Sequence, residues 1–277
     1  MKLIVKKSLR VLIELPWLII GIIFVSPALL VIINAFKPLG DILKTPFALP
    51  ETFNTENIVY VIKNMKYFSA LFNTLLIAVV VVTVTILLSS MAGYRLTRQG
   101  GKLSAIITML FLSSLLVPFQ TIMIPIAKIT STLGIGNSML GYIITVIPLY
   151  APMGIFVCMG FVKTVPESLE EAAIIDGCSP YGVFFRIVMP LLRPTLASLV
   201  VLFTLWIWND YALANMMLTS QSTRTLTIAI FGFFSSFTNR WDYALAALAL
   251  SILPITLFYI AMQKHIVKGI SAGAIKG

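Results

Sequence analysis

Residues 163–194 read KTVPESLEEAAIIDGCSPYGVFFRIVMPLLRP, the most polar stretch of a chain that is otherwise mostly apolar. Thr164 and Glu167 have the spacing of a capping box, in which the first residue caps a helix and the second bonds back to it. Ser168 and Glu171 have the same spacing. The pattern therefore predicts a helix that begins at one of these two positions.

The second half of the stretch predicts a turn and another short helix. Gly177 suits the left-handed conformation that ends many helices. Ser179 followed by Pro180 fits an N-cap with proline at the first helical position. Pro190 and Pro194 are expected to end this second helix. The stretch thus predicts two short helices that are joined by a glycine turn.

The composition around this stretch is that of a membrane protein. The chain has 277 residues, of which 59% are hydrophobic and only 11% are charged. A soluble domain carries about a quarter charged residues. The fold class predicted is therefore all-α, a polytopic helical membrane protein with six transmembrane helices. The length suits a single transmembrane domain over residues 1–277.

Six apolar segments are expected to cross the membrane. The two intervals 35–68 and 219–241 are predicted to be external, the first with a short helix near 56–66 and the second with an interfacial helix across 228–234. A cleaved signal peptide at the N-terminus is disfavoured because its apolar run is too long. The spans are predicted at about 11–34, 69–94, 103–127, 139–162, 196–218 and 242–262.

The positive charges predict the orientation of these spans. With both termini inside, the cytoplasmic segments hold 13 of the 20 basic residues: Lys2, Lys6, Lys7, Arg10, Arg95, Arg98, Lys102, Lys163, Arg186, Arg193, Lys264, Lys268 and Lys276. The outer segments hold the other 7: Lys37, Lys44, Lys63, Lys66, Lys128, Arg224 and Arg240. This bias follows the positive-inside rule, and it explains the net charge of +10 without a nucleic-acid partner. The polar stretch 163–194 is thereby placed in the cytoplasm.

The order Glu171-Ala172-Ala173, three residues, Gly177, nine residues, Ile187-Val188-Met189-Pro190 resembles the EAA loop of binding-protein-dependent ABC import permeases. Met189 stands where that family usually has leucine, which is a swap of similar volume. The alternative is an ordinary polar loop. The resemblance implies a cytoplasmic coupling helix that docks into a groove of an ATPase subunit. The docking residues it implies are Glu167, Glu170, Glu171, Ala172, Ala173, Asp176, Gly177 and Pro190.

The chain offers few residues for chemistry of its own. Its one histidine, His265, lies in the C-terminal tail, and no cysteine and histidine cluster has the spacing of a metal site. We therefore expect no catalytic residue, no metal and no cofactor in this chain. The resemblance implies that ATP and Mg²⁺ bind to the separate ATPase subunit.

Trp206-Ile-Trp-Asn-Asp-Tyr211 places an ionisable residue in an apolar segment. A charge inside a bilayer costs roughly 2.5–3.5 kcal/mol on insertion scales, so it should face the bundle interior or water. The segment resembles the Trp-Asn-Asp stretch of carbohydrate-type permeases, which implies a place on the translocation path. A structural hydrogen bond between helices is the alternative. The candidate path residues are Trp206, Asn209, Asp210 and Tyr211, with Asn73, Gln120 and Tyr150 as weaker ones.

The tail, residues 263–277, is similar to the terminus of the maltose-transporter type of sugar permease, in which it reaches toward the ATPase dimer. A frayed tail is the alternative. The whole resemblance implies a carbohydrate importer, for a di- or oligosaccharide, with a second permease, two ATPase copies and an extracytoplasmic binding protein. Phe231, Phe233 and Phe234 are the candidate contacts with that binding protein.

Other functions remain open at this point. The same subfamily would accommodate another polar solute, such as a glycerol phosphodiester. A secondary transporter would be expected to show an internal repeat or several buried ionisable residues, whereas Asp210 alone lies clearly within a predicted span. A membrane-embedded enzyme is opposed by the missing histidine and metal ligands.

Overall fold

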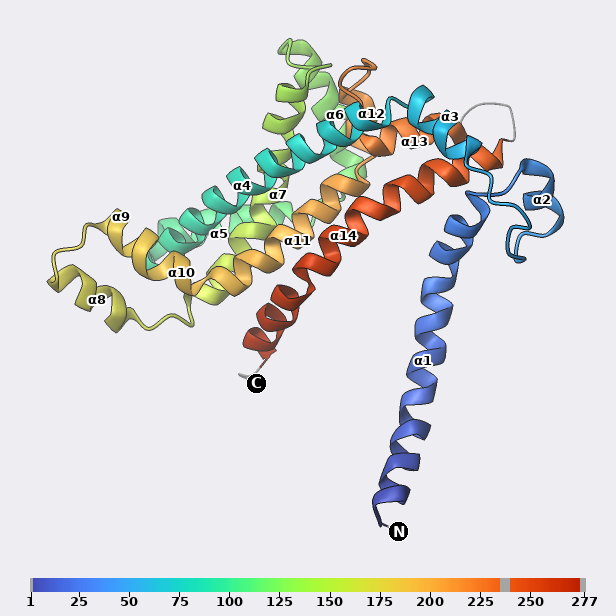
Figure 1. Cartoon of the computed structure of the whole chain (residues 1–277). Helices are drawn as coiled ribbons and strands as arrows, with labels where there is room; N and C mark the ends of the chain where they lie inside the picture. The colour runs from blue at the N-terminus through green and yellow to red at the C-terminus, as the bar shows by residue number, and fades with distance from the viewer. Residues whose placement is uncertain (1, 235–239, 275–277) are drawn as a thin grey trace. The chain divides into compact units, whose positions relative to one another are not determined.

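The computed structural model describes the backbone of residues 2–234 and 240–274, with side chains for 14–234 and 240–264. All regular elements within these residues are helical (Figure 1). They are α1 (Lys2–Asn34), α2 (Leu39–Lys44), α3 (Glu56–Asn64), α4 (Tyr67–Gln99), α5 (Gly101–Ser114), α6 (Phe119–Thr132), α7 (Met139–Val162), α8 (Glu167–Ile175), α9 (Pro180–Val183), η1 (Phe184–Val188), α10 (Met189–Leu191), α11 (Arg193–Asn209), α12 (Ala212–Met217), α13 (Leu226–Phe234) and α14 (Trp241–Ala274).

Among the described residues, four helices are long and apolar enough to cross a membrane alone: Glu14–Asn34 of α1, α4, α7, and Trp241–Lys264 of α14. Two pairs qualify if each counts as one bent span, namely α5 with α6 and Pro180–Leu191 with α11. These segments overlap the six predicted from the sequence. The prediction of an all-α, multi-pass membrane protein is confirmed.

The third predicted span is not one continuous helix. α5 and α6 meet at an angle of 100°. Pro118 precedes α6 with an extended backbone (φ −60°, ψ 129°). Proline has no N–H to donate and disfavours the helical conformation in the residue before it, so the helix breaks here. The prediction of a single continuous helix across residues 103–127 was therefore wrong.

The fifth predicted span is interrupted as well. α11 ends at Asn209, and Asp210 has an extended backbone (φ −71°, ψ 108°) before α12 begins at Ala212. Asp210 therefore lies at a helix break and not inside a helix that runs to residue 218, as the apolar run had suggested.

The short helices outside the spans agree better with the sequence. α3 lies within the predicted interval 56–66, and α13 includes all of 228–234. α2 was not predicted. The sixth predicted span ends near 262, whereas α14 continues as a helix to Ala274. The tail thus begins as an extension of the last helix.

The chain divides into two compact units. The first comprises residues 1–67 and 229–254, and the second comprises 68–228 and 255–277. In the first unit, Asn57 is buried and donates its amide to the backbone oxygens of Ala35 and Lys37. Tyr60 of α3 stacks on Tyr243 of α14 with ring centroids 3.9 Å apart. Side-chain contacts thus join the interval 35–66 to the start of the last helix.

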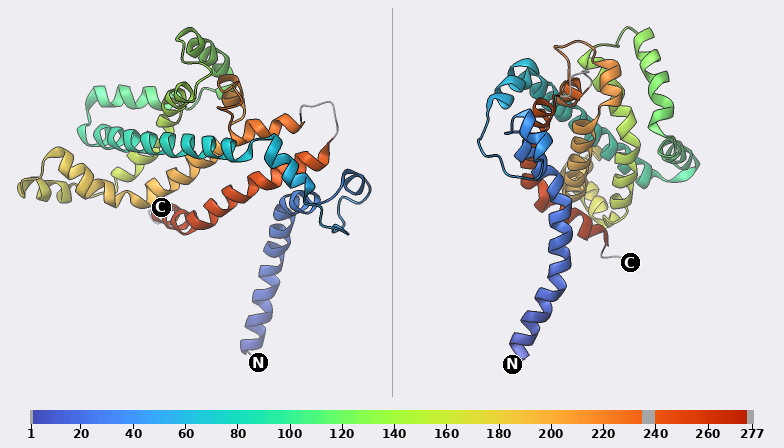
Figure 2. Two further views of the ribbon diagram at one scale, coloured as in Figure 1. Left: turned by 45° about the horizontal axis from the view of Figure 1, so that its top comes forward. Right: turned by 90° about the vertical axis from the view of Figure 1, so that its right-hand side faces the viewer.

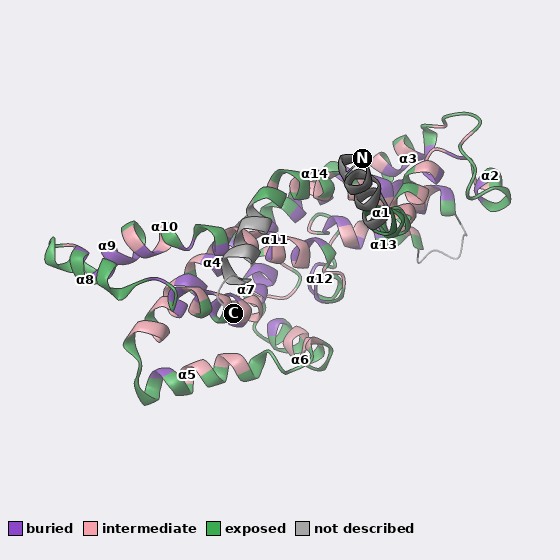
Figure 3. Cartoon of the chain, turned by 90° about the horizontal axis from the view of Figure 1, so that it is seen from below, coloured by how far each residue is buried: buried purple, intermediate pink, exposed green. Residues whose placement is uncertain are grey.

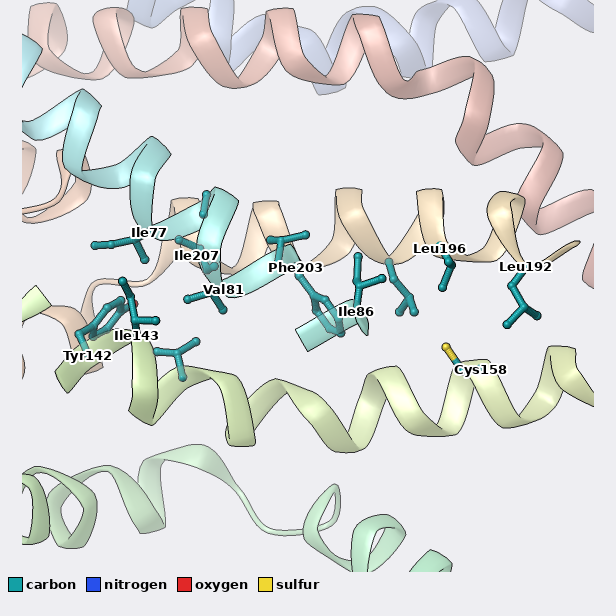
Figure 4. Close-up of a cluster of buried hydrophobic side chains, with 14 of the residues drawn as sticks. Ile77, Val81, Ile86, Tyr142, Ile143, Cys158, Leu192, Leu196, Phe203 and Ile207 are labelled. Carbon is teal, nitrogen blue, oxygen red and sulfur yellow. The ribbon is translucent and has the colours of Figure 1, made fainter. Parts of the chain in front are cut away.

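The core of the second unit lies between the long helices α4, α7 and α11 (Figure 4). Two glycines allow α4 and α7 to approach closely. A Cβ on Gly154 would lie 2.5 Å from the Ser89 hydroxyl, and a Cβ on Gly93 would lie 2.9 Å from the Cβ of Cys158. Small residues at such crossings are common between membrane helices. Any larger residue at either glycine would force α4 and α7 apart.

The two ends of the second unit differ. The helices α8, α9 and α10 lie beyond one end of α4, α7 and α11, whereas α6 and α12 lie near the other end (Figures 1 and 2). The polar stretch that the sequence singled out therefore forms one end of this unit.

Candidate functional site

The helix α8 begins without a side-chain cap. Its N-cap position is Pro166, and no side chain bonds the free N–H groups there. The hydroxyl of Thr164 donates instead to the backbone oxygen of Phe161, 2.8 Å away in the preceding turn. The helix already includes Ser168, so neither predicted capping box forms. An extended Pro166 sets the start of the helix at Glu167.

The end of α8 follows the prediction closely. Gly177 has a φ of +84°, in the left-handed region. Its N–H donates to the oxygen of Ile174, and the N–H of Cys178 donates to the oxygen of Ala173, both at 2.9 Å. This pair of bonds is the Schellman arrangement, in which glycine closes a helix and reverses the chain.

The second helical segment starts as predicted and ends differently. Ser179 accepts a hydrogen bond from the N–H of Gly182 at 3.2 Å, with Pro180 at the start of α9. The chain then passes through the π-helix η1 and continues past Pro190 to Leu191. Pro190 therefore does not stop this segment. The break comes after Leu191, and the chain bends by 75° into α11.

The predicted docking residues differ in how far they are buried (Figure 3). Glu170 and Ala173 are both only 7% exposed and face the interior of the second unit. Pro190 is half-buried. The exposed members of the predicted set are Glu167, Glu171, Ala172, Asp176 and Gly177.

Glu170 is engaged within its own chain. Its Oε1 accepts from Arg98 Nε at 2.8 Å, and its Oε2 accepts from the Tyr94 hydroxyl at 2.7 Å. Both donors belong to the last turns of α4. Glu170 is thus paired within its own chain, and its predicted role in docking an ATPase stays a prediction.

The sequence analysis missed the apolar side chains that this loop exposes. Ile175 is 85% exposed, and Leu169, Ile174 and Tyr181 are also exposed. Phe185 and Leu191 of the same stretch are exposed as well. The signal in the sequence was the presence of these large apolar residues within the most polar stretch of the chain. An exposed apolar group of this kind marks a surface that contacts another protein or lipid.

A second candidate site is a cavity of about 640 Å³ in the second unit. Side chains of α5, α6, α7 and α11 line it, and most of them are apolar. Four of the predicted path residues lie in its wall: Tyr150, Trp206, Asn209 and Asp210. The structure thus gathers residues that lie up to 60 positions apart in the sequence.

An aromatic group forms part of this wall. The rings of Tyr150 and Trp206 meet edge to face at 5.0 Å, and Phe203 lies behind both, at 5.6 Å from Tyr150 and 5.5 Å from Trp206. The amide of Asn209 donates to the oxygen of Leu205 at 2.8 Å, one turn back along α11. Asn209 remains exposed, so its carbonyl oxygen is accessible.

Asp210 is held by a residue that the sequence analysis missed. The hydroxyl of Tyr142 donates to Asp210 Oδ2 at 2.5 Å, and the N–H of Leu213 donates to Oδ1 at 3.2 Å. Tyr142 has no exposed surface. The carboxylate therefore links α7 to the break between α11 and α12 while part of it lines the cavity. Tyr142 lies in an apolar run, and nothing in the sequence distinguished it from a packing residue.

Three predicted path residues do not line the cavity. Asn73 is buried elsewhere and donates its amide to the oxygens of Ser222 and Arg224 at 2.8 and 3.0 Å. It thereby holds the segment before α13 in place. Gln120 is exposed on α6, and Tyr211 is half-buried next to Asp210. A place for these three residues on a path stays a prediction.

The remaining predicted contacts lie on α13. Phe231 and Phe234 are 44% and 40% exposed, and Phe233 is half-buried. The rings of Phe231 and Phe234 lie 6.2 Å apart, so they form one apolar surface. Within the described part of the chain, no three His, Cys, Asp or Glu side chains come together as metal ligands.

Comparison with known proteins gives consistent results. Residues 85–272 match the protein family described as "Binding-protein-dependent transport system inner membrane component". The chain is 35% identical to the probable starch degradation products transport system permease of Thermoanaerobacterium thermosulfurigenes, over 94% of both chains. It is 30% identical to the melibiose/raffinose/stachyose import permease of Bacillus subtilis, over 98% of both chains.

A solved structure shares the fold. A chain of a bacterial ABC transporter involved in the import of the acidic polysaccharide alginate superposes with a TM-score of 0.81. The superposition covers 93% of this chain and 96% of that one, at 17% sequence identity.

Proposed function

Because the chain belongs to the family of binding-protein-dependent transport system inner membrane components, we propose that it is a permease subunit of an ATP-driven carbohydrate importer. The observation that carries this proposal is its similarity, along almost the whole chain, to permeases for starch products and for raffinose-type sugars. The family is one of transport permeases and not of enzymes, and the similarity to binding-protein-dependent sugar permeases favours this proposal over an ion-coupled secondary transporter.

The end of the second unit formed by α8–α10 is the proposed docking site for an ATPase subunit. Ile174 and Ile175 present apolar side chains that nothing in the second unit covers, and Glu167 and Glu171 flank them with negative charge. An apolar centre with a charged rim is the usual anatomy of a protein interface. The excess of basic residues in the segments on this side supports its placement in the cytoplasm, where ATP is available. ATP and Mg²⁺ would bind to that subunit and not to this chain.

The cavity is the proposed contribution of this subunit to the translocation path. Its volume of about 640 Å³ falls within the range of roughly 300–1,000 Å³ that small-molecule sites occupy. Trp206 and Tyr150 offer ring faces, while Asn209 and Asp210 offer hydrogen-bonding oxygens. Sugars carry both apolar C–H faces and hydroxyl groups, so this combination suits a saccharide. A second, related permease would form the other half of the path.

The mechanism that follows is alternating access. Closure of an ATPase dimer would move α8 and its neighbours as a rigid body and switch the path between inward- and outward-facing states. An extracytoplasmic binding protein would deliver the sugar from outside, and the exposed phenylalanines of α13 are its proposed contact. This chain would transmit the movement of the ATPase and form part of the translocation path, with no catalytic residue of its own.

The test uses the assembled transporter in lipid vesicles. We expect ATP hydrolysis to rise when the binding protein is added with a neutral di- or oligosaccharide, and the sugar to accumulate in the vesicles. A glycerol phosphodiester serves as the competing solute. Stimulation by that solute alone would replace the carbohydrate with another polar substrate, and hydrolysis that ignores every solute would overturn the proposal.

A variant pair tests the docking site in the same preparation. Ile175→Glu places a charge in the apolar centre, and we expect loss of ATPase co-purification. Leu133→Glu is the matched control, because Leu133 is also an exposed apolar residue but lies just after α6 at the other end of the unit. Equal ATPase recovery with both variants would remove α8 from the interface.

A further inference from the structure

Arg98 makes an unusually complete set of contacts with the coupling loop. Its Nε and Nη2 lie 2.8 and 2.7 Å from Glu170 Oε1. Nη2 also donates to the backbone oxygen of Val165 at 2.7 Å, and Nη1 lies 3.3 Å from Glu167 Oε1. One guanidinium in the last turn of α4 thus binds two side chains and one backbone group of the segment 165–170.

Tyr94 completes this arrangement from the preceding turn of α4. Its hydroxyl donates to the second oxygen of Glu170 at 2.7 Å. Its ring lies 5.4 Å from the ring of Phe184, which belongs to the second helical segment of the loop. Residues four apart lie on the same face of a helix, so Tyr94 and Arg98 grip the loop together. We call this group, Tyr94, Arg98 and Glu170, the α4 clamp.

The α4 clamp differs from an ordinary surface ion pair. The side chains of Arg98 and Glu170 are only 14% and 10% exposed. Ion pairs on the surface contribute little, whereas loss of one partner of a buried pair leaves an uncompensated charge in a poorly solvated place. The residues around the ion pair are also poorly solvated, because Val165 and Phe184 are buried in the same core as the long helices. The clamp therefore constrains the loop strongly.

The clamp also connects to the cavity through a continuous set of packed groups. On α4, the hydroxyl of Ser89 donates to the oxygen of Ala151 on α7 at 3.2 Å, and Gly93 touches α7 beside Cys158. This contact lies next to the cavity wall, because Tyr150, which lines the cavity, immediately precedes Ala151 on α7. Packed side chains and rigid helices of this kind are the elements through which energetic coupling between two sites is carried, and the coupling itself is what the experiments below measure.

We propose that Arg98 is a positioning residue that joins the coupling helix α8 to α4. The movement of the docked ATPase is then transmitted to the cavity through α4 and α7. This inference rests on the proposed function and assigns the connection to residues outside the coupling loop itself. Without the clamp, α8 would be tied to α7 by the short connection 163–166 and to the rest of its own loop. A displaced α8 would then turn about that connection without moving α4.

Two measurements on the assembled complex in nanodiscs test the clamp. The first is hydrogen exchange of the α8 amides, which needs no transport. We expect Arg98→Gln and Glu170→Gln each to speed exchange in α8 at least tenfold, with α13 unchanged. The exchanged pair Arg98→Glu with Glu170→Arg should recover part of the protection. Arg95→Gln is the matched control, because Arg95 is exposed one turn earlier on α4 and has no ion pair among the described residues.

The second measurement is the number of sugar molecules imported per ATP hydrolysed. We expect Arg98→Gln to retain ATP hydrolysis but to lower this ratio at least fivefold, with partial recovery in the exchanged pair. A wild-type ratio in Arg98→Gln would overturn the coupling role, and unchanged exchange in α8 would overturn the clamp itself. If the unmodified complex hydrolyses ATP without regard to sugar while α8 exchange still depends on Arg98, the proposed function fails and the clamp stands as a structural connection only.

Discussion

Removal of the Tyr142 hydroxyl is the sharpest test of what Asp210 does. The substitution Tyr142→Phe keeps the ring in its fully buried position and deletes only the bond to Asp210 Oδ2. The other oxygen of Asp210 keeps its bond from the N–H of Leu213. The change therefore isolates one contact between α7 and the break that follows α11.

The expected cost follows from the kind of bond. A hydrogen bond to a charged group is worth about 1.5–3 kcal/mol net. Because Asp210 lines the cavity, water can hydrate part of the carboxylate, and we take the lower end. About 1.5 kcal/mol corresponds to a fall in melting temperature of about 3–6 °C at the size scaling of larger domains. Asp210→Ala also removes the acceptor of the Leu213 N–H, and the loss of this bond adds about 1 kcal/mol.

Thermal unfolding of the purified complex and sugar uptake per assembled complex are measured side by side. We expect Tyr142→Phe to lower the melting temperature and to keep most of the uptake, and Asp210→Asn to lose uptake by more than its stability explains. Tyr150→Phe is the control, because the Tyr150 hydroxyl has no hydrogen bond among the described residues although its ring lines the same cavity. A double-mutant cycle of Tyr142→Phe with Asp210→Asn should show coupling of at least about 0.5 kcal/mol. Additive effects would show that the bond between Tyr142 and Asp210 contributes nothing, and uptake that only follows the melting temperature would refute the assignment of Asp210 to the path.

Three further predictions concern the loop, the orientation and the outer surface. Gly177→Val should reduce ATPase co-purification, because a left-handed backbone costs a residue with a side chain about 1–2 kcal/mol, whereas Gly177→Asn should retain it; equal recovery of both would contradict a role for the turn. A cysteine at Ser131, in the last turn of α6, should react with an impermeant reagent from outside and one at Gln99, the last residue of α4, should not; the reverse pattern would place the loop on the wrong side for an ATPase. A photocrosslinker at Phe233 of α13 should capture the binding protein during turnover, and capture of lipid alone would leave α13 as an interfacial helix.

The spans were predictable because their signal is local and repeated, but the breaks within them were not. Proline illustrates the reason. Pro148 and Pro152 lie inside α7 without ending it, whereas Pro118 ends a helix and turns the chain by 100°. The intrinsic effect of proline is the same at each position. Neighbouring helices decide whether the freed backbone groups are satisfied in place, and the sequence does not show those neighbours.

The two adjacent glutamates of the loop show the same limit at the candidate site. Glu170 and Glu171 follow one another, and a helix turns by about 100° between them. Nothing in the local sequence says which of the two faces the bundle. Arg98, 72 residues earlier in the chain, decides it by binding Glu170 and leaving Glu171 exposed. Side-chain partners this distant were beyond the reach of motif spacing.

Two hydrogen bonds between a tyrosine and a carboxylate, Tyr94 to Glu170 and Tyr142 to Asp210, bear on the register of the long helices. The apolar core between α4, α7 and α11 stabilises the unit, and the close contacts at Gly93 and Gly154 contribute to the register of α4 against α7. A slip of one helical turn, about 5.4 Å, would replace one set of apolar contacts with another. It would also break the bond of Tyr94 to Glu170 at one end and that of Tyr142 to Asp210 at the other. The two tyrosine–carboxylate bonds therefore help to fix where the loop 163–194 and the cavity lie along the long helices.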